Sequence, residues 1–352
     1  MKKWLKLIFF IYLFILSIEL IKKSSLLLAP DIQNLLIQNI TPLKAISVGW
    51  FTTSIVQSSG AISSITAAFA GSNIIDLSTA VYVLIGASLG TTITAMIISL
   101  ITVTQKRKDF RHGFEIALCY SIYSALLLII VFFLEFFFSL FSKTSLFLAT
   151  AFENNFFLFN VPDTIGIITN PIINIIPIES QKVLAFIFGF ALLILALKYL
   201  GSSVINVLGG EEKARKFINK HFESKYKTYF IGAFLTAIVF SSSITIGLLV
   251  PLAASRLISL KKAIPFILGA DIGTFTDTFL AALIIGKTTA IATAFAYSLL
   301  GVLGALIFLP NINFLHKLTK YTSKKLIKIS RKKALYILMS FILIPLAIIL
   351  IF

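Results

Sequence analysis

Long apolar segments recur along the chain, and they constrain its fold more than any other feature of the sequence. A helix needs about 20 predominantly apolar residues to cross the hydrocarbon core of a bilayer. Apolar segments of this kind stand at 4–21, 79–104, 113–141, 181–208, 263–286, 288–309 and 334–352. We therefore expect an all-α integral membrane protein with about seven full crossings, the first of them retained as a membrane span.

The composition excludes an ordinary soluble protein. Hydrophobic residues make up 58% of the chain and charged residues 13%, against about 45–50% and about 25% in soluble proteins. The single cysteine, Cys119, allows no intrachain disulfide. His112, His221 and His316 stand in charged loop segments, which argues against a histidine-ligated metal centre inside a helical bundle.

The lysines and arginines predict how the chain is oriented. We interpret 45–71 and 229–255, which are apolar but rich in Ser and Thr, as re-entrant hairpins that return to the side they entered. Of the 31 lysines and arginines, 25 then face the cytoplasm and 6 the outside, as the positive-inside rule requires. The N-terminus is thus expected in the cytoplasm, and the protein in the cell (plasma) membrane. The net charge of +17 needs no nucleic-acid partner, and the basic loops are expected to contact membrane lipid.

The same pattern divides the chain into six segments. They are an N-terminal transmembrane helix with an outer linker (1–44), a first repeat with a hairpin and two spans (45–141), an extracellular connecting segment (142–180), a span with a cytoplasmic loop (181–228), a second repeat with a hairpin and two spans (229–309), and a basic cytoplasmic loop with the last transmembrane helix (310–352).

An internal repeat relates two parts of the chain. Residues 49–95 align without a gap to residues 232–278 at a constant offset of 183, and 16 of the 47 positions are identical. Because the charge pattern has the two repeats entered from opposite sides, we expect inverted-topology repeats, each with a re-entrant helical hairpin and a broken or Gly-containing span. Inverted repeats with discontinuous helices that meet near the midplane are typical of secondary transporters.

Each repeat carries a Ser-rich sequence near the middle of its hairpin. The first is Gln57-Ser58-Ser59-Gly60 and the second is Phe240-Ser241-Ser242-Ser243. If the chain turns there, the helix that follows presents free N–H groups and the positive end of its dipole beside serine hydroxyls. Such a helix end suits phosphate or another oxyanion. The alternative is that Ser and Gly only allow close helix packing, and their duplication at the repeat offset favours binding.

A glycine motif lies in the span that follows each hairpin. The two motifs are Gly86-Ala-Ser-Leu-Gly-Thr-Thr92 and Gly269-Ala-Asp-Ile-Gly-Thr-Phe275. Glycines four apart weaken a helix, and the hydroxyl and carboxylate oxygens nearby are hard ligands suited to a small cation such as sodium. Asp271 and Asp277 lie well inside a span, where acids serve as cation ligands or proton carriers. Close helix packing is again the alternative for the glycines.

The remaining acids and the aromatic residues have a simpler interpretation. Glu19, Glu115 and Glu135 stand near span ends, and we expect them to snorkel toward the interface. The aromatic residues, mostly the 34 phenylalanines, are expected to face lipid and to carry no information about a site.

The paired Ser-Ser segments, each followed about 30 residues later by Gly-Ala-x-Ile/Leu-Gly-Thr, resemble the type II sodium/phosphate cotransporter family. The resemblance covers about 49–105 and 232–286. It implies sodium-driven symport of inorganic phosphate by alternating access, with membrane lipid as surroundings, and it allows a homodimer. It also implies that phosphate lies among Gln57, Ser58, Ser59, Ser241, Ser242 and Ser243. The sodium ligands that it implies are Ser88, Thr91, Thr92, Asp271, Thr274 and Thr276. We also expect Thr53 and Asp277 to be sodium ligands.

The sequence departs from the family pattern at a few positions of these motifs. Phe240 stands where the family has Gln, and Gly60 stands where Ser is usual. Asp271 occupies a position that is often Asn, and it adds a negative charge near the expected anion.

Two other functions therefore stay open beside sodium/phosphate symport. They are proton- or sodium-coupled transport of another anion, and a non-transporting membrane protein of the same fold. An intramembrane enzyme would need a general base beside its serine nucleophile, and the centre of neither repeat contains His or Lys. We expect no enzyme and no cofactor, with sodium as the coupling ion.

Overall fold

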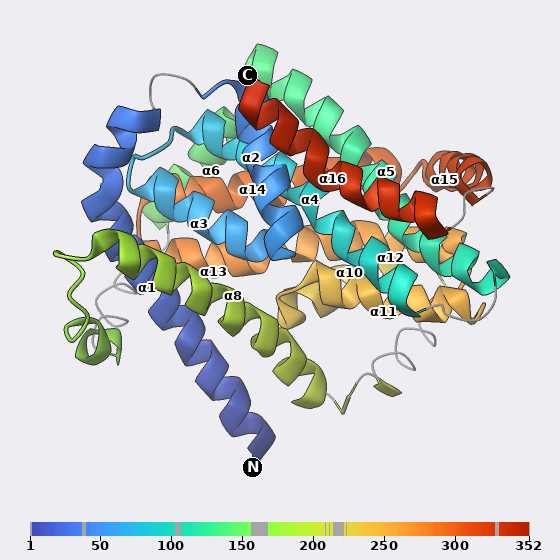
Figure 1. The fold of residues 1–352 in the computed structure, drawn as a ribbon, viewed down its shortest axis with the longest axis horizontal. Coiled ribbons are helices and arrows are strands. Elements are labelled where there is room, and N and C mark those ends of the chain that lie inside the picture. Colours follow the sequence, from blue (N-terminus) through green and yellow to red (C-terminus); the bar gives the residue numbers. More distant parts are fainter. Residues whose placement is uncertain are drawn as a thin grey trace.

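The computed structural model describes residues 2–36, 40–102, 107–155, 168–207, 209–210, 212–213, 222, 224–327 and 331–351. These residues fold into helices joined by short turns (Figure 1). In chain order the helices are α1 (Lys2–Leu36), α2 (Pro42–Val56), α3 (Ser59–Gly71), α4 (Leu77–Thr102), α5 (Arg107–Phe138), α6 (Leu140–Asn155), α8 (Lys182–Val207), α10 (Lys225–Val239), α11 (Ser242–Ala254), α12 (Leu260–Gly273), α13 (Phe275–Ile285), α14 (Thr288–Phe308), α15 (Ile312–Ile327) and α16 (Arg331–Ile351).

Six helical stretches of the described residues are long and apolar enough to cross a membrane. They are Lys3–Leu28, Leu77–Leu100, Arg111–Phe138, Lys182–Leu200, Leu260–Ile285 and Thr288–Phe308. The seventh expected crossing corresponds to α16, whose apolar part, Tyr336–Ile351, is shorter. Many of the large apolar side chains on these helices are exposed, for example Phe137 and Phe188, as suits contact with lipid rather than water. The protein is therefore a multi-pass, all-α membrane protein.

Helix pairs α2/α4 and α10/α12 pack with their backbones in close contact, and glycines make this possible. A Cβ atom on Gly86 would lie 2.0 Å from the carbonyl oxygen of Ile46, and one on Gly269 would lie 1.9 Å from that of Tyr229. The same holds one turn further along, where Gly90 lies against Trp50 and Gly273 against Ala233. Each contact of the first pair recurs 183 residues later in the second. The glycine motifs thus serve helix packing, which was the alternative interpretation of them.

Each of the two Ser-rich apolar segments forms two helices separated by a short break. The first segment comprises α2 and α3, and the second comprises α10 and α11. The second helix of each pair packs against the other half of the chain: α3 contacts α13 and α14, and α11 contacts α4 and α5. Figure 1 shows α3 beside α13 and α14, while α10, α11 and α12 lie together at the other end of the molecule. The two halves are therefore interleaved.

The connecting segment 142–180 contains most of α6, which packs against α14. Glu135 fixes the start of α6, because its Oε2 accepts hydrogen bonds from the backbone N–H groups of Phe141 (2.9 Å) and Ser142 (3.2 Å). Its Oε1 accepts a third from Ser78 (3.1 Å). A carboxylate beside the first N–H groups of a helix accepts hydrogen bonds from donors that have no partner inside the helix. Its negative charge is also stabilised by the positive end of the helix dipole.

The expectation that Glu19, Glu115 and Glu135 snorkel toward the interface is wrong. Their relative exposures are 5%, 1% and 1%. Each has polar or charged partners that make burial tolerable. Glu19 lies 3.5 Å from Lys22, and Glu115 accepts from Arg111, Ser323 and Lys320.

Candidate functional site

The break between α2 and α3 and the break between α10 and α11 have the same backbone geometry. Gln57 follows α2 with φ 57° and ψ 28°, and Phe240 follows α10 with φ 56° and ψ 30°. Their N–H groups donate to the carbonyl oxygens of Thr53 (2.7 Å) and Thr236 (2.8 Å). Left-handed backbone at a residue other than glycine costs about 1–3 kcal/mol and tends to persist at functional sites. We call residues 57–60 the first tip and residues 240–243 the second tip.

A serine caps the helix that follows each tip. Ser58 has extended backbone, and its Oγ accepts from the N–H of Ala61 (3.2 Å). Ser241 does the same for Ile244 (3.2 Å). An N-cap satisfies one of the four free N–H groups at a helix start, and the others remain available beside the positive end of the helix dipole. Each tip thus offers the elements of an anion site without a basic side chain.

The remaining tip residues differ in exposure and in their neighbours. Ser59 is buried beside Tyr297 of α14, and Ser242 is buried beside Tyr120 of α5. Gln57 is exposed, Ser243 is buried, and Phe240 is half-buried. The first tip therefore contacts a helix of the second half, and the second tip contacts a helix of the first half.

Asp271 on α12 lies where the two halves meet. Its Oδ2 accepts a hydrogen bond from the hydroxyl of Tyr123 (2.8 Å), and its Oδ1 accepts a longer one from Tyr120 (3.4 Å). Ser88 of α4 approaches the same carboxylate. The hydroxyl of Tyr123 occupies the space above Gly304, where a Cβ atom would lie 2.1 Å from it. The carboxylate is thus fixed by partners on α4 and α5 of the other half of the chain.

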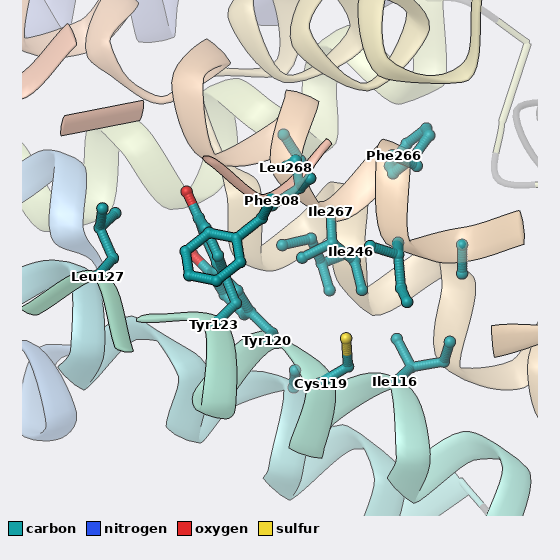
Figure 2. Packing of buried hydrophobic residues seen from close by; sticks show 14 of the residues in the cluster. Ile116, Cys119, Tyr120, Tyr123, Leu127, Ile246, Phe266, Ile267, Leu268 and Phe308 are labelled. Atoms are coloured by element: carbon teal, nitrogen blue, oxygen red, sulfur yellow. The ribbon is translucent and has the colours of Figure 1, made fainter. Parts of the chain in front are cut away.

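Tyr120, Tyr123 and Tyr297 were not among the expected site residues, and the expectation that aromatic residues face lipid fails for them. Figure 2 shows Tyr120 and Tyr123 projecting from α5 in the same direction, into the buried cluster that contains Ile246 and Phe308. Both tyrosines are almost fully buried. A sequence signal existed: two tyrosines three residues apart in an apolar span place two hydroxyls on one helix face. Buried tyrosine hydroxyls normally find a polar partner.

Asp277 on α13 is fully buried and has a different set of neighbours. Its Oδ1 accepts from the N–H (2.7 Å) and the hydroxyl (3.2 Å) of Thr278. The Thr278 hydroxyl is also hydrogen-bonded to Ser63 of α3. Oδ2 has no hydrogen-bond partner among the described residues, and it lies against Gly60 of the first tip.

The hydroxyls that were expected to bind sodium fall into two groups. Those of Thr53 and Thr91 are buried and have no partner in the described part of the chain. In the second half, Thr236 corresponds to Thr53, and its hydroxyl pairs with that of Thr245 at 2.7 Å. Ile62 stands at the position that corresponds to Thr245, so Thr53 lacks this partner. The others are engaged: Ser88 approaches Asp271, Thr92 accepts from Ser121 (2.9 Å), Thr274 donates to Ala270 (3.0 Å) and Thr276 donates to Gly273 (3.0 Å).

These contacts define what the arrangement can do chemically. Two helix starts with serine hydroxyls can hold an oxyanion. Buried oxygens without partners, on Asp277, Thr53 and Thr91, are hard ligands that suit a small cation. The contacts join Asp271 to Ser88 and Asp277 to Gly60, so the two carboxylates belong to two different neighbourhoods.

Comparison with known proteins adds independent information. A family model described as Na⁺/Pi-cotransporter matches residues 13–160 and 192–330. The chain is 24% identical to sodium-dependent phosphate transport protein 2A of Ovis aries, over 96% of this chain and 65% of that protein. It is 25% identical to the Rattus norvegicus protein over the same shares, and 33% identical to protein 2B of Homo sapiens over 33% of this chain and 18% of that protein. The chain thus spans about 65% of the length of the first two relatives. No solved structure matches it.

Proposed function

The chain belongs to the Na⁺/Pi-cotransporter family, and from this premise we propose that it is a secondary active transporter that couples the movement of inorganic phosphate to sodium. In this proposal two inverted repeats alternate the access of one central site. The first repeat (45–141) holds α2 to α5 and the second (229–309) holds α10 to α14. Each hairpin is re-entrant, with its tip deep in the membrane. The protein lies in the cell membrane, and the N-terminus of the chain lies in the cytoplasm.

The observation that carries the proposal is the matched geometry of the two tips. A left-handed residue, a serine N-cap and a buried serine follow one another at 57–59 and again at 240–242. Ser59, Ser242 and the free N–H groups beside them supply donors, which is what a phosphate oxygen accepts. Two such helix starts that face one anion from opposite directions would replace its hydration shell without any fixed cation.

Sodium fits the proposal because side-chain oxygens that could bind it lie near the two tips. Asp271 and Asp277 carry negative charge at a depth where it needs a partner. Thr53 and Thr91 offer hydroxyl oxygens without other partners among the described residues. Because sodium binding neutralises these groups, it would favour the binding of phosphate nearby, and the two substrates would move together.

Uptake of radiolabelled phosphate into proteoliposomes tests the proposal. The purified chain is reconstituted, and uptake is measured with an inward sodium gradient and with matched potassium and proton gradients. Accumulation that requires sodium supports the proposal. Liposomes that hold folded protein and accumulate no phosphate under any gradient contradict it.

Phe240 and the two aspartates favour a second candidate, a proton- or sodium-coupled transporter of another anion. Phe240 brings a phenyl ring rather than an amide to the second tip, and Asp277 brings a carboxylate to the first. Uptake driven by protons alone would favour this candidate. A set of other oxyanions, tested for thermal stabilisation of the purified protein, would then find the substrate.

A further inference from the structure

A cavity of about 210 Å³ lies where α5, the turn between α11 and α12, and α15 meet. These elements come from both halves of the chain, because α5 belongs to the first half and α11 and α12 belong to the second. The polar side chains that line the cavity are those of His112 and Glu115 on α5, Arg256 and Ser259 in the turn, and His316 and Lys320 on α15. A molecule bound in this cavity would therefore contact both halves at once.

The described side chains that line this cavity carry more positive than negative charge. Arg256 and Lys320 are cations, and His112 and His316 can become cations. Burial lowers the pKa of His316, and the positive charges of Lys320 and Lys261 lower it further. The same charges would stabilise an anion in this place.

Glu115, the one acid among these described lining residues, is already neutralised. It accepts hydrogen bonds from Arg111 (3.1 Å) and from Lys320, and Nδ1 of His112 lies 3.6 Å from its Oε2. Two permanent cations thus face a single carboxylate, so the cluster keeps an excess of positive charge even before Arg256 is considered.

The internal repeat offers a comparison for the turn at the edge of the cavity. At the repeat offset of 183, Asn73 corresponds to Arg256, and Asp76 corresponds to Ser259. The backbone of the two turns is the same. Asn73 and Arg256 have φ of 55° and 61°, and each donates its N–H to the carbonyl three residues earlier, at 3.1 Å and 3.0 Å. The two turns therefore differ in their side chains and not in their fold.

The helix that follows each turn begins differently. In the first half, Oδ1 of Asp76 accepts a hydrogen bond from the N–H of Thr79 (3.0 Å), so a carboxylate of the chain itself caps α4. In the second half, the side chain of Ser259 makes no capping hydrogen bond to α12. Lys261 and Lys262 follow, and they line a neighbouring cavity of about 460 Å³ together with Ser259. The start of α12 thus lacks the anion that α4 has and is surrounded by cations, an arrangement that a bound anion would complete.

Arg256 is an unusual residue for the backbone that it adopts. Left-handed backbone is uncommon for residues other than glycine, and Asn, as at position 73, is among the few that adopt it readily. A residue in such a conformation tends to persist where it serves a site. Arg256 brings to this position a guanidinium group, which can bind two phosphate oxygens at once.

The outer face of α15 has the chemistry of a helix at a membrane surface. Phe314 and Tyr321 are 52% and 59% exposed, and Lys317 is exposed between them. Nζ of Lys325 lies 4.5 Å from the centre of the Tyr321 ring. These residues are three or four positions apart, so they share one face of the helix. Aromatic rings beside lysines are typical of helices at the level of the lipid headgroups, which places the cavity at the base of α15 near lipid phosphates.

We propose that this cavity binds a phosphate group and that an anionic membrane lipid supplies it. Arg256, Lys320 and the start of α12 hold the phosphate oxygens, while the outer face of α15 contacts the membrane. The phosphate takes the place at α12 that Asp76 takes at α4, and it joins α5 to α12 and α15. Free phosphate has the same chemistry, so the experiment has to separate the two sources. The proposal does not depend on which anion is transported, because the cavity belongs to neither tip.

The test measures the melting temperature of the purified full chain in detergent. One series adds short-chain phosphatidic acid, with phosphatidylcholine of the same chain length as the reference. A second series adds potassium phosphate, with potassium chloride at the same ionic strength as the reference. The variants are Arg256→Asn and Ser259→Asp, which give the second turn the residues of the first. Lys143→Gln is the matched control, because it removes a positive charge from α6, which lies toward the opposite end of the molecule from α15 (Figure 1).

The site predicts a distinct result for each variant. Both tip the balance of charge at the turn without disturbing its backbone, because Asn and Asp already stand at these places in the first turn. Ser259→Asp should raise the melting temperature without any ligand, since its carboxylate can cap α12. Phosphatidic acid should stabilise the parent protein and Lys143→Gln, because a ligand that binds the folded state raises the melting temperature. Its apparent affinity should fall about tenfold or more in Arg256→Asn and in Ser259→Asp, as expected when a charged contact is lost.

The two series assign the site and its ligand. A response to phosphatidic acid that both variants lose supports the proposal, and it does so whether or not phosphate is transported. A response to potassium phosphate that both variants lose, without any response to phosphatidic acid, keeps the cavity as a phosphate site and overturns its lipid source. The proposal is overturned entirely if the parent protein responds to neither ligand, or if Arg256→Asn and Ser259→Asp respond to both as the parent does.

Discussion

The hydroxyl of Tyr123 donates a 2.8 Å hydrogen bond to Oδ2 of Asp271 across 148 residues of sequence. This contact joins α5 of one half of the chain to α12 of the other. Because the tyrosine hydroxyl also fits above Gly304, its position is fixed from two sides. Asp271 is therefore held in one orientation by a partner on another helix.

We expect Tyr123→Phe to lower stability by about 1.5–3 kcal/mol, the range for a hydrogen bond to a charged group. Sodium dependence of uptake should weaken as well, since Asp271 loses its shorter hydrogen bond. Thermal unfolding and the sodium concentration for half-maximal uptake measure the two effects. Tyr336→Phe is the matched control, because Tyr336 is 71% exposed. Equal behaviour of the two variants would contradict a positioning role for Tyr123.

Ser241→Ala should destabilise the start of α11 by about 1 kcal/mol, since it removes an N-cap. The matching change Ser58→Ala should have a similar effect on α3, because the two caps have the same 3.2 Å geometry. Both should also weaken phosphate binding, which is measured by titration of the purified protein. Ser298→Ala serves as the control, because that hydroxyl donates to the carbonyl of Phe295 in its own helix. Unchanged phosphate affinity in both tip variants would refute the anion site.

Phe240→Gln gives the second tip the residue that the first tip has at the corresponding position, Gln57. We expect the variant to fold, because Gln57 already adopts the same left-handed backbone that position 240 requires. The added amide donor should tighten phosphate binding by a few-fold, that is by about 0.5–1.5 kcal/mol for one neutral hydrogen bond. Phosphate titration of the parent and the variant measures the change. Weaker binding in a folded variant would indicate that the phenyl ring itself contacts the substrate.

Glu115→Gln should loosen the attachment of α15 to α5. Glu115 is almost fully buried and binds Arg111, Lys320 and Ser323. The expected loss is about 1–3 kcal/mol, less than for a fully buried pair, because Arg111 and Lys320 are 32% and 31% exposed. Limited proteolysis within α15 and thermal unfolding measure the effect. A variant as resistant as the parent would show that apolar contacts alone hold α15.

His316 gives α15 a dependence on pH. It lines a cavity of about 210 Å³ together with Glu115 and Lys320. Burial lowers its pKa below the usual 6.5, and Lys320 and Lys261 lower it further. Protonation is then less favourable in the folded state, so the contribution of His316 to stability is present above pH 6.5 and is lost as the pH falls below it.

The check is the melting temperature at a series of pH values in the parent and in His316→Gln. The parent should lose more stability than the variant between neutral pH and pH values below 6.5. Identical pH profiles would show that His316 does not contribute.

The breaks between α2 and α3 and between α10 and α11 could be located from the sequence, whereas the contacts between the halves could not. The Ser-rich repeats at 57–60 and 240–243 mark where a helix stops and another starts, since Ser is a strong N-cap residue. Nothing local indicates that Asp277 lies against Gly60 or Tyr123 against Asp271, because such contacts depend on how interleaved helices pack. The burial of Glu115 and Glu135 was missed for the same reason, as their partners lie up to 208 residues away or in the next helix.

The interleaving of the helices also determines where the molecule can bend. In the pairs α2/α3 and α10/α11, the first helix is held to its own half of the chain by backbone contacts at glycine, whereas the second helix also packs on the other half. If the two repeats rotate against each other, neither helix can follow both, and the chain between them must absorb the difference. That chain consists of little more than Gln57 and Ser58 at one tip and Phe240 and Ser241 at the other. In the proposed transport cycle, the residues that would bind the anion would therefore also serve as hinges.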